Sequence, residues 1–314
     1  VPEYGFDFKS IWVSGFSRKI NLNNLLFPIK LFVSMIQSLL INMNLKPRVA
    51  IGSGAYVSGP VIWAASVMGS KIILLEQNSY PGVTNRMLEK RADEVHITFE
   101  ESKKYFRQPE KLKLTGNPIR INLKMEEKIS ALKKFGLDAS KKTLLIIGGS
   151  GGAKSLNGAI AKSIPELTNK GIQIIWQTGP LYYEQYQKLE NEFVKVMAFV
   201  SDMSAAYSAC DLLIARAGAT TIAEVSYLGL PVIFVPSTNV AANHQYKNAK
   251  AIVDANAAEM IEDNNLLNEL VSKTTELIFD ENKIQKLKKN ISAFAKPDAA
   301  KIIAQRAIEL AESI

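Results

Sequence analysis

The chain has 314 residues, a length that exceeds one ordinary hydrophobic core and favours two domains. With 47% apolar and 22% charged residues it has the composition of a soluble globular protein, and its single cysteine, Cys210, excludes a disulfide framework and suits a reducing cytosol. The net charge of +8 favours anionic partners such as phosphates or a lipid surface. Nucleic acid is not expected, because the chain has no Lys/Arg run with interleaved aromatic residues and no zinc spacing.

The first two patterned segments are FKSIWVSG, residues 8–15, which we predict as a strand, and the apolar stretch Asn24–Met43. The second predicts a helix with a narrow polar stripe through Lys30, Ser34, Gln37, Ser38 and Asn42. We favour a packed crossover helix for it. The alternative places its apolar end (Leu25, Leu26, Phe27 and Ile29) and the cations Arg18, Lys19 and Lys30 on an anionic membrane surface.

Further along, short apolar runs alternate with helical stretches, which is typical of parallel sheets. The runs include KIILLEQN, TLLIIGGSGG, QIIWQTG, VKVMAFVSD and PVIFVPS, each with a turn-forming or polar segment at its carboxyl end. Open α/β sheets bind ligands at such ends. We predict two doubly wound domains with a cleft between them. One comprises residues 1–118 with 297–314, and the other residues 119–296.

A glycine cluster in TLLIIGGSGGAKSLNGAIA, residues 143–161, joins a predicted strand to a predicted helix, as in loops that hold phosphates. It is not a nucleotide-triphosphatase loop, because Ala153 precedes Lys154 and Ser155. It is not a dinucleotide fingerprint either, because Lys154 stands where the third glycine belongs. A tight turn without a ligand is the alternative.

Four further places carry polar side chains suited to a ligand. Glu224 lies in a predicted helix among small residues, and Glu76, Gln77 and Asn78 end an apolar strand as sugar-binding residues often do. Arg120 suits a bidentate contact to a diphosphate, and His244 is either a ligand contact or part of a solvated loop. His96 is predicted as a core or strand residue, and with two histidines in all a His/Cys metal site and a Ser-His-Asp hydrolase are not expected. Together these places predict a nucleotide-sugar cleft.

The order and spacing of eight motifs resemble the MurG family over essentially the whole chain: GSGAYVSGP, EQNSYPGVTNR, LTGNPIR, IIGGSGGAKSLN, WQTG, FVSDMSAAYSACDLLIARAGATTIAE, GLPVIFVPS and HQYKNA. Members of this family are the N-acetylglucosaminyltransferases that complete lipid II in bacterial peptidoglycan synthesis. The resemblance implies a GT-B fold, a pair of Rossmann-like α/β domains that take the acceptor on the N-terminal side and the UDP-sugar on the C-terminal side.

The same resemblance implies the binding residues. Those for the donor are Arg120 near the diphosphate and uridine, Gly149, Ser150 and Gly151 at the nucleotide, Val200 at uracil, Ala219, Thr220 and Thr221 at the phosphates, Glu224 at the ribose, and His244 and Gln245 at the N-acetylglucosamine hydroxyls. Those for the acceptor are Tyr56, Ser58, Gly59, Glu76, Gln77, Asn78 and Asn85.

Two departures from the family pattern concern the acceptor side. Ala55 stands where the family favours glycine, which restricts the backbone there. The family's first glycine loop, with its His, is expected upstream of Val1, and the proton acceptor is expected there too. The catalytic residue is therefore unassigned, with His244 and Glu76 as the weaker candidates within the chain.

The expected reaction is a displacement at the anomeric carbon by an acceptor hydroxyl, with inversion and with UDP leaving. Because Arg120 and helix N-termini can stabilise the departing diphosphate, no metal or other cofactor is expected. The implied partners are UDP-N-acetylglucosamine, undecaprenyl-linked lipid I and anionic lipid at the cytoplasmic face of the cell membrane, in a role in cell-wall biogenesis, cell shape and division. The alternatives are another nucleotide-sugar enzyme of GT-B type (an epimerase, or a glycosyltransferase with a different acceptor), a non-catalytic nucleotide-binding module and a P-loop ATPase.

Overall fold

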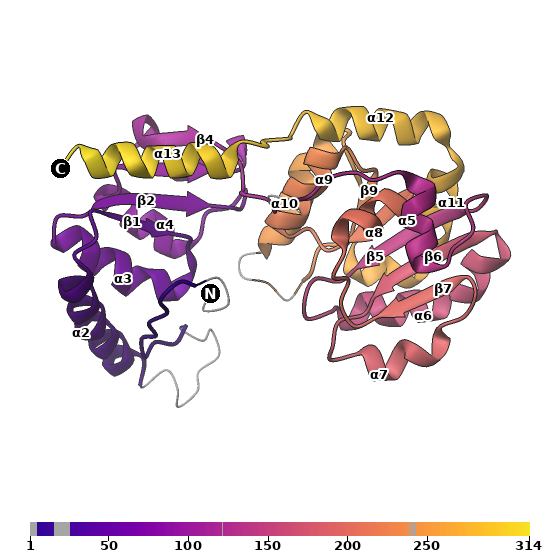
Figure 1. Ribbon diagram of the computed structural model, residues 1–314, viewed down its shortest axis with the longest axis horizontal. Coiled ribbons are helices and arrows are strands. Elements are labelled where there is room, and N and C mark those ends of the chain that lie inside the picture. Colours follow the sequence, from indigo (N-terminus) through magenta and orange to yellow (C-terminus); the bar gives the residue numbers. More distant parts are fainter. Residues whose placement is uncertain (1–4, 16–25, 121, 239, 241–242) are drawn as a thin grey trace. The chain divides into compact units, whose positions relative to one another are not determined.

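Two compact units make up the chain in the computed structural model (Figure 1), which describes residues 5–15, 26–120, 122–238, 240 and 243–314. The N-terminal unit comprises Val1–Gly116 with Asp298–Ile314, and the central unit comprises Asn117–Pro297. Each unit has its own parallel sheet.

The sheet of the N-terminal unit has four parallel strands in the order β1-β2-β3-β4. They are β1 (Val49–Gly52), β2 (Lys71–Glu76), β3 (Glu94–Ile97) and β4 (Leu112–Leu114). The helices are α2 (Phe27–Leu45), α3 (Ala55–Val67), α4 (Val83–Leu88) and α13 (Ala299–Glu312), with 3-10 turns η2 (Glu89–Arg91), η3 (Glu100–Tyr105) and η4 (Pro109–Lys111). The apolar runs of β2 and β3 are almost wholly buried, as is usual for parallel strands covered on both faces.

Helix α13, yellow in Figure 1, returns from the end of the chain to the N-terminal unit and contacts β1 and β2. It is held there by Arg306, whose Nε donates to both carboxylate oxygens of Glu94 at 3.0 and 3.2 Å. Glu94 Oε2 also lies 3.0 Å from His96 Nε2, and His96 Nδ1 lies 3.2 Å from Thr115 Oγ1. His96 is therefore a buried strand residue, as predicted.

The strand predicted over residues 8–15 is wrong, because that segment has neither helix nor strand. The segment holds the apolar run Ile11–Val13, but a strand is stabilised by pairing with a neighbour. Phe8 and Trp12 are instead at least half exposed, and the Trp12 backbone N–H donates to Gln37 Oε1 of α2 at 2.7 Å.

Helix α2 packs against α3, and the residues it buries most deeply belong to its polar stripe. Ser34, Ser38 and Asn42 are its buried residues, and Asn42 Nδ2 donates to Ser38 O and to Val61 O of α3 at 2.8 and 3.4 Å. The opposite face exposes large apolar side chains: Ile29, Phe32, Ile36, Leu40 and Met43. Among the described helices, α2 is the one long and apolar enough to cross a membrane, a property that core helices of soluble proteins share.

The sheet of the central unit has six parallel strands in the order β10-β9-β8-β5-β6-β7. The strands are β5 (Lys142–Ile147), β6 (Ile172–Gln177), β7 (Val194–Met197), β8 (Leu212–Ala215), β9 (Val232–Phe234) and β10 (Glu259–Met260). The helices are α5 (Lys128–Phe135), α6 (Lys154–Asn169), α7 (Tyr183–Tyr186), α8 (Met203–Ala209), α9 (Ala219–Leu228), α10 (His244–Asp254), α11 (Leu266–Phe279) and α12 (Glu281–Ser292), with 3-10 turns η5 (Gln187–Leu189) and η7 (Asp263–Asn265).

The core of the central unit lies where α6 and α11 cover one face of the sheet, around Leu144, Leu156 and Trp176. Cys210 is buried in this unit with a free thiol, and burial raises the pKa of that thiol to about 12. The thiol is therefore neutral and unreactive at physiological pH.

Candidate functional site

Five neighbouring strands of the central sheet end at one edge, and every candidate donor residue of this unit except Arg120 follows one of them. In sheet order, Gln245 follows β9, Glu224 follows β8, Ser150 follows β5 and Val200 follows β7. The remaining strand, β6, leads into the turn at Thr178 and Gly179. Since carboxyl ends of parallel strands form the ligand-binding edge of open α/β sheets, this edge is the candidate site.

The glycine loop between β5 and α6 has a backbone that only glycine adopts without strain. Gly149 and Gly152 have φ values of +91° and +79°, in the left-handed region. A Cβ at Gly152 would lie 2.1 Å from the carbonyl oxygen of Thr178, whereas one at Gly149 or Gly151 would meet nothing within 4 Å. The loop is thus packed tightly against the end of β6 on one side and open on the other, where Ser150 is exposed.

Gln177, at the end of β6, links the loops that follow β5 and β7. Its Nε2 donates to Gly149 O at 3.1 Å, and its Oε1 accepts from the Val200 backbone N–H at 2.9 Å. Asn157 of α6 adds a second link, because its Nδ2 donates to Thr178 O and its Oδ1 accepts from Trp176 Nε1. These buried amides were not singled out from the sequence, although Gln177 stands in the quoted motif WQTG; a buried polar residue ending an apolar strand was the available signal.

Glu224 has a buried carboxylate in which one oxygen accepts a hydrogen bond and the other accepts none within the described structure. The Tyr207 hydroxyl donates to its Oε2 at 2.8 Å, and Arg120 Nε lies 3.3 Å from its Oε1 in an ion pair. No hydrogen bond with good geometry reaches Oε1 from the described residues. Burial and the neighbouring Glu224 carboxylate raise the pKa of Tyr207 well above its usual value, so its hydroxyl remains a donor.

The N-terminus of α9 lies directly before Glu224 and carries unsatisfied backbone N–H groups. Its N-cap is Gly218, which provides no capping side chain, so the first amides of Ala219, Thr220 and Thr221 have no partner within the helix. Asn117 Nδ2 donates to Thr220 Oγ1 at 3.3 Å. This geometry suits an anion.

Two cavities adjoin the carboxyl edge. One of about 370 Å³ lies beside Arg120 and the segment after Val200, lined by Asn122, Leu123 and residues 201–204. Another of about 770 Å³ lies between α6 and the start of α11 and reaches Gly148 and Gln245. At that end Gln245 Oε1 accepts from the Ser237 backbone N–H at 2.9 Å, which fixes the start of α10 against the end of β9.

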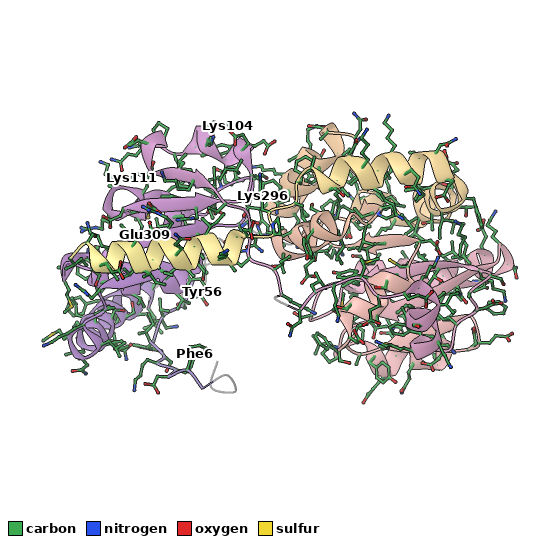
Figure 2. All side chains as sticks on the ribbon, turned by 45° about the horizontal axis from the view of Figure 1, so that its top comes forward. Phe6, Tyr56, Lys104, Lys111, Lys296 and Glu309 are labelled. Atoms are coloured by element: carbon green, nitrogen blue, oxygen red, sulfur yellow. The ribbon has the colours of Figure 1, made fainter. Side chains whose placement is uncertain are left out.

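In the N-terminal unit, the corresponding glycine loop joins β1 to α3. Gly54 and Ala55 both have positive φ, +84° and +58°, and the strain on Ala55 explains the family's preference for glycine there. Tyr56, labelled in Figure 2, is 51% exposed. Ser58 and Gly59 lie in the following turn of α3, where the Ser58 hydroxyl donates to Ala55 O.

Glu76, at the end of β2, holds the loop that follows it. Its Oε1 accepts from the N–H and the side-chain amide of Asn78, and its Oε2 accepts from Gly82 N and Asn85 Nδ2, both at 2.9 Å. Gln77 Nε2 reaches across to Ser53 O at 3.2 Å. Glu76, Asn78 and Asn85 therefore form a hydrogen-bonded cluster at the end of β2, and Gln77 links the same loop to the one that follows β1.

Comparison with known proteins identifies the family. The N-terminal domain model of glycosyltransferase family 28 matches residues 1–97, and its C-terminal domain model matches residues 143–303. The UDP-N-acetylglucosamine–N-acetylmuramyl-(pentapeptide) pyrophosphoryl-undecaprenol N-acetylglucosamine transferase of Flavobacterium psychrophilum is 42% identical over 100% of this chain and 86% of its own length. Its counterpart in Cytophaga hutchinsonii is 40% identical over 99% of this chain and 84% of its own. The crystal structure of Acinetobacter baumannii MurG, 27% identical, matches with a TM-score of 0.72 over 93% of this chain and 82% of that one.

The chain belongs to the MurG family. It is a glycosyltransferase, and its two parallel-sheet units have the GT-B fold of MurG, so the predicted family and fold class are confirmed.

The weaker catalytic candidates of this MurG-family chain lie in different surroundings. Glu76 is buried, and it accepts four hydrogen bonds from the loop that follows it, as expected of a positioning residue. His244 begins α10 and is half-buried beside the candidate sugar end.

Val200, predicted to contact uracil, has a side chain that is only 2% exposed, and its backbone N–H is already bonded to Gln177. Its side chain therefore offers little surface to a nucleotide base.

Acidic and metal-binding side chains do not gather at this MurG-family site. Within the described ranges, no three His, Cys, Asp or Glu side chains form a group that could hold a metal ion. Arg120 and the α9 amides are positive groups at this edge that can meet a diphosphate.

Proposed function

We propose that this chain transfers N-acetylglucosamine from UDP-N-acetylglucosamine to undecaprenyl-pyrophosphoryl-N-acetylmuramyl-pentapeptide (lipid I), giving lipid II for peptidoglycan synthesis. Its similarity to the named transferases over nearly its whole length supports this proposal. The observation that carries it is the Glu224 carboxylate, buried at the end of the glycine-loop edge with Oε1 not hydrogen-bonded within the described structure. A ribose diol supplies the hydroxyl donors that such an oxygen takes up.

The donor lies along the sheet edge in this proposal. Glu224 binds the ribose, the α9 amides from Ala219 to Thr221 meet the diphosphate, and the loop Gly149–Gly151 contacts the nucleotide through its open side. Arg120 leaves or shares its ion pair with Glu224 to neutralise the phosphate charge. Val200 contributes at the base through its backbone, since its side chain is buried.

At the sugar end, His244 and Gln245 address the N-acetylglucosamine hydroxyls. Gln245 Oε1 is already fixed by the Ser237 N–H, so its amide N–H₂ group is the part that can bind a hydroxyl. The acceptor hydroxyl displaces UDP with inversion at the anomeric carbon. Charge grows on the departing diphosphate, where preorganised N–H groups and Arg120 stabilise the transition state without a metal.

In this proposal the acceptor binds at two loops of the N-terminal unit, those that follow β1 and β2. Glu76 and Asn85 hold the loops in place, and Tyr56, Ser58, Gly59, Gln77 and Asn78 supply the surface that meets lipid I. The proton acceptor of the reaction is not assigned to a described residue, and His244 is the candidate nearest the sugar end.

The membrane location is proposed on α2. Its exposed apolar face, with Lys30 alongside, suits insertion at the cytoplasmic surface of an anionic bilayer, where a lipid-linked acceptor would be reached. Arg18, Lys19 and Leu25 of the predicted patch lie outside the described residues. Through the supply of lipid II, this activity would serve cell-wall biogenesis, cell shape and division.

Calorimetry with three nucleotides tests the proposal. We expect UDP-N-acetylglucosamine to bind in the presence of a metal chelator, UDP-glucose to bind more weakly, and ATP with Mg²⁺ not to bind. Preferential ATP binding would support the ATPase alternative, and consumption of the donor without an acceptor would support an epimerase or hydrolase.

A further inference from the structure

The cavity of about 770 Å³ in the central unit extends away from the proposed nucleotide contacts. It shares Gln245 with the sugar end and Gly148, Gly152 and Ala153 with the glycine loop, but most of its lining comes from α6, η7 and the first residues of α11, and none of the described residues of α9 contributes. Its size falls within the range of small-molecule sites, roughly 300 to 1,000 Å³. Neither the donor nor the acceptor contacts proposed above account for this part of the surface.

Gly158 opens the cavity in the middle of α6. A glycine inside a helix costs roughly 0.5 to 1 kcal/mol relative to alanine, so it usually has a packing reason. Here a Cβ would meet nothing within 4 Å, and φ is not in the left-handed region. No other part of the central unit therefore packs into the space above Gly158. The absence of a side chain there leaves a groove open between the side chains one helical turn before and one turn after it.

Those two side chains are Lys154 and Lys162. Both are exposed, both line the cavity, and neither has a hydrogen bond or ion pair with the described part of the chain. At spacings of four residues from Gly158 they lie on the same helix face. Two ammonium groups thus flank an open groove, and neither forms an ion pair with a carboxylate of the described residues.

A third cation, Arg216, closes the inner end of the cavity. It is 8% exposed, and its guanidinium is fixed by bonds to Val235 O, Asp263 Oδ1 and Ser155 Oγ at 3.0, 2.6 and 2.7 Å. These bonds use three of the five N–H donors that an arginine has. Asp263 is the one acidic residue of the lining, so the cavity keeps an excess of positive charge.

Part of the lining is less polar. Tyr182 and Leu266 contribute to it, and Leu267 is 62% exposed although it borders the cavity. A ligand with an anionic group and an uncharged body would place its anionic group against the cations and its uncharged body against these less polar residues.

We propose that this cavity, the α6 groove, is a second anion site that binds a small phosphate-bearing molecule next to the sugar end of the donor site. The groove is separate from the nucleotide contacts, so UDP and the anion bind together. A ligand in the groove would contact Gln245, which also belongs to the proposed sugar end of the donor site. Binding in the groove would therefore change the affinity of the chain for the donor sugar.

The test is calorimetric titration of inorganic pyrophosphate into the chain saturated with UDP. We expect binding that weakens at least about tenfold in the double variant Lys154→Ala/Lys162→Ala, because two charged donors are lost. The variant Gly158→Leu should abolish it by filling the groove. The matched control Lys133→Ala/Lys170→Ala removes the same charge from exposed positions elsewhere in the central unit and should leave it unchanged.

Two results would overturn the proposal. Loss of pyrophosphate binding on addition of UDP would place the anion at the nucleotide contacts, and equal weakening by both double variants would mean a general charge effect. UDP binding by the Lys154→Ala/Lys162→Ala variant, measured in the same experiment, reports on folding and on the proposed donor site separately from the groove.

Discussion

A single carboxylate, Glu224, connects the fold of the central unit to its proposed ligand. Its Oε2 is fixed by Tyr207 and its Oε1 faces Arg120 without a hydrogen bond. Oε1 is paired with Arg120 but accepts no hydrogen bond within the described structure, so it keeps acceptor capacity that a ligand hydroxyl can use.

Replacement of Glu224 by alanine should weaken UDP-N-acetylglucosamine binding by roughly 1.5 to 3 kcal/mol, the value of hydrogen bonds to a charged group. Isothermal titration measures the change. Glu281→Ala, which removes an exposed carboxylate from α12 of the same unit, serves as the control and should bind normally. An unaltered dissociation constant in a folded Glu224→Ala variant would remove this residue from the site.

Two glycines of one loop should respond differently to alanine. Gly152→Ala adds a Cβ against Thr178 O in the left-handed region, so we expect it to destabilise the central unit by about 2 to 4 kcal/mol. Gly151→Ala meets open space and should change stability by less than about 0.5 kcal/mol. Urea unfolding of both variants is the measurement, and similar losses in the two would mean that the loop geometry is described wrongly.

At the scale of elements, the sequence predicted which segments fold but not which face of each one packs. The period of Asn24–Met43 correctly indicated a helix, but a stripe of small polar residues looks solvent-facing until a partner helix is known. Ser34 and Ser38 are small enough for α3 to approach closely, and their hydroxyls bond within α2, so burying them costs little. The strand predicted over residues 8–15 is absent for a related reason, because a short apolar run does not guarantee a neighbouring strand to pair with.

The exposed face of α2 should bind anionic vesicles. Charge reversal of Arg18, Lys19 and Lys30 together should release the chain, since each cation near the surface contributes about 1 kcal/mol. Phe32→Glu should also reduce binding, whereas Leu181→Glu, an equally drastic change at an exposed site of the central unit, should not. If the α2 variants sediment with anionic vesicles as well as the unaltered chain does, the exposed face of α2 has another role.

Acid should loosen the attachment of α13. Burial lowers the pKa of His96, so the neutral imidazole is the folded form. Burial opposes ionisation of Glu94, but hydrogen bonds from Arg306 and His96 outweigh it and hold the pKa of that carboxyl below its usual value. Both groups bind more protons when unfolded, so stability falls as the pH drops below about 6.5, and falls further below about 4.5.

Thermal unfolding between pH 7 and pH 4 measures this effect. Replacing His96 by glutamine should flatten the part of the profile near pH 6, while Arg306→Ala should lower stability most at neutral pH, where Glu94 is ionised. A profile that keeps its slope near pH 6 in the glutamine variant would assign the titration to other groups.

At the scale of the whole molecule, two parallel sheets present their loops at strand ends, and the motifs placed these loops correctly along the chain. Glycines, strand ends and Glu224 are local signals, so the sequence was sufficient for them. The interactions of Gln177 with Gly149 and Val200, and of Tyr207 with Glu224, join residues 17 to 28 positions apart. Such pairings arise from the packing of neighbouring strands and helices, and no spacing in the sequence encodes them.

The most direct test of the proposed function is the product formed from UDP-N-acetylglucosamine labelled in the sugar and a lipid I analogue, with a metal chelator present. We expect label to move to the lipid in a new bond of inverted configuration, with release of one UDP for each sugar transferred, and to stop moving in Glu224→Ala. Donor that binds while the lipid stays unlabelled, or label that appears as free sugar whether or not lipid I is added, would contradict the account.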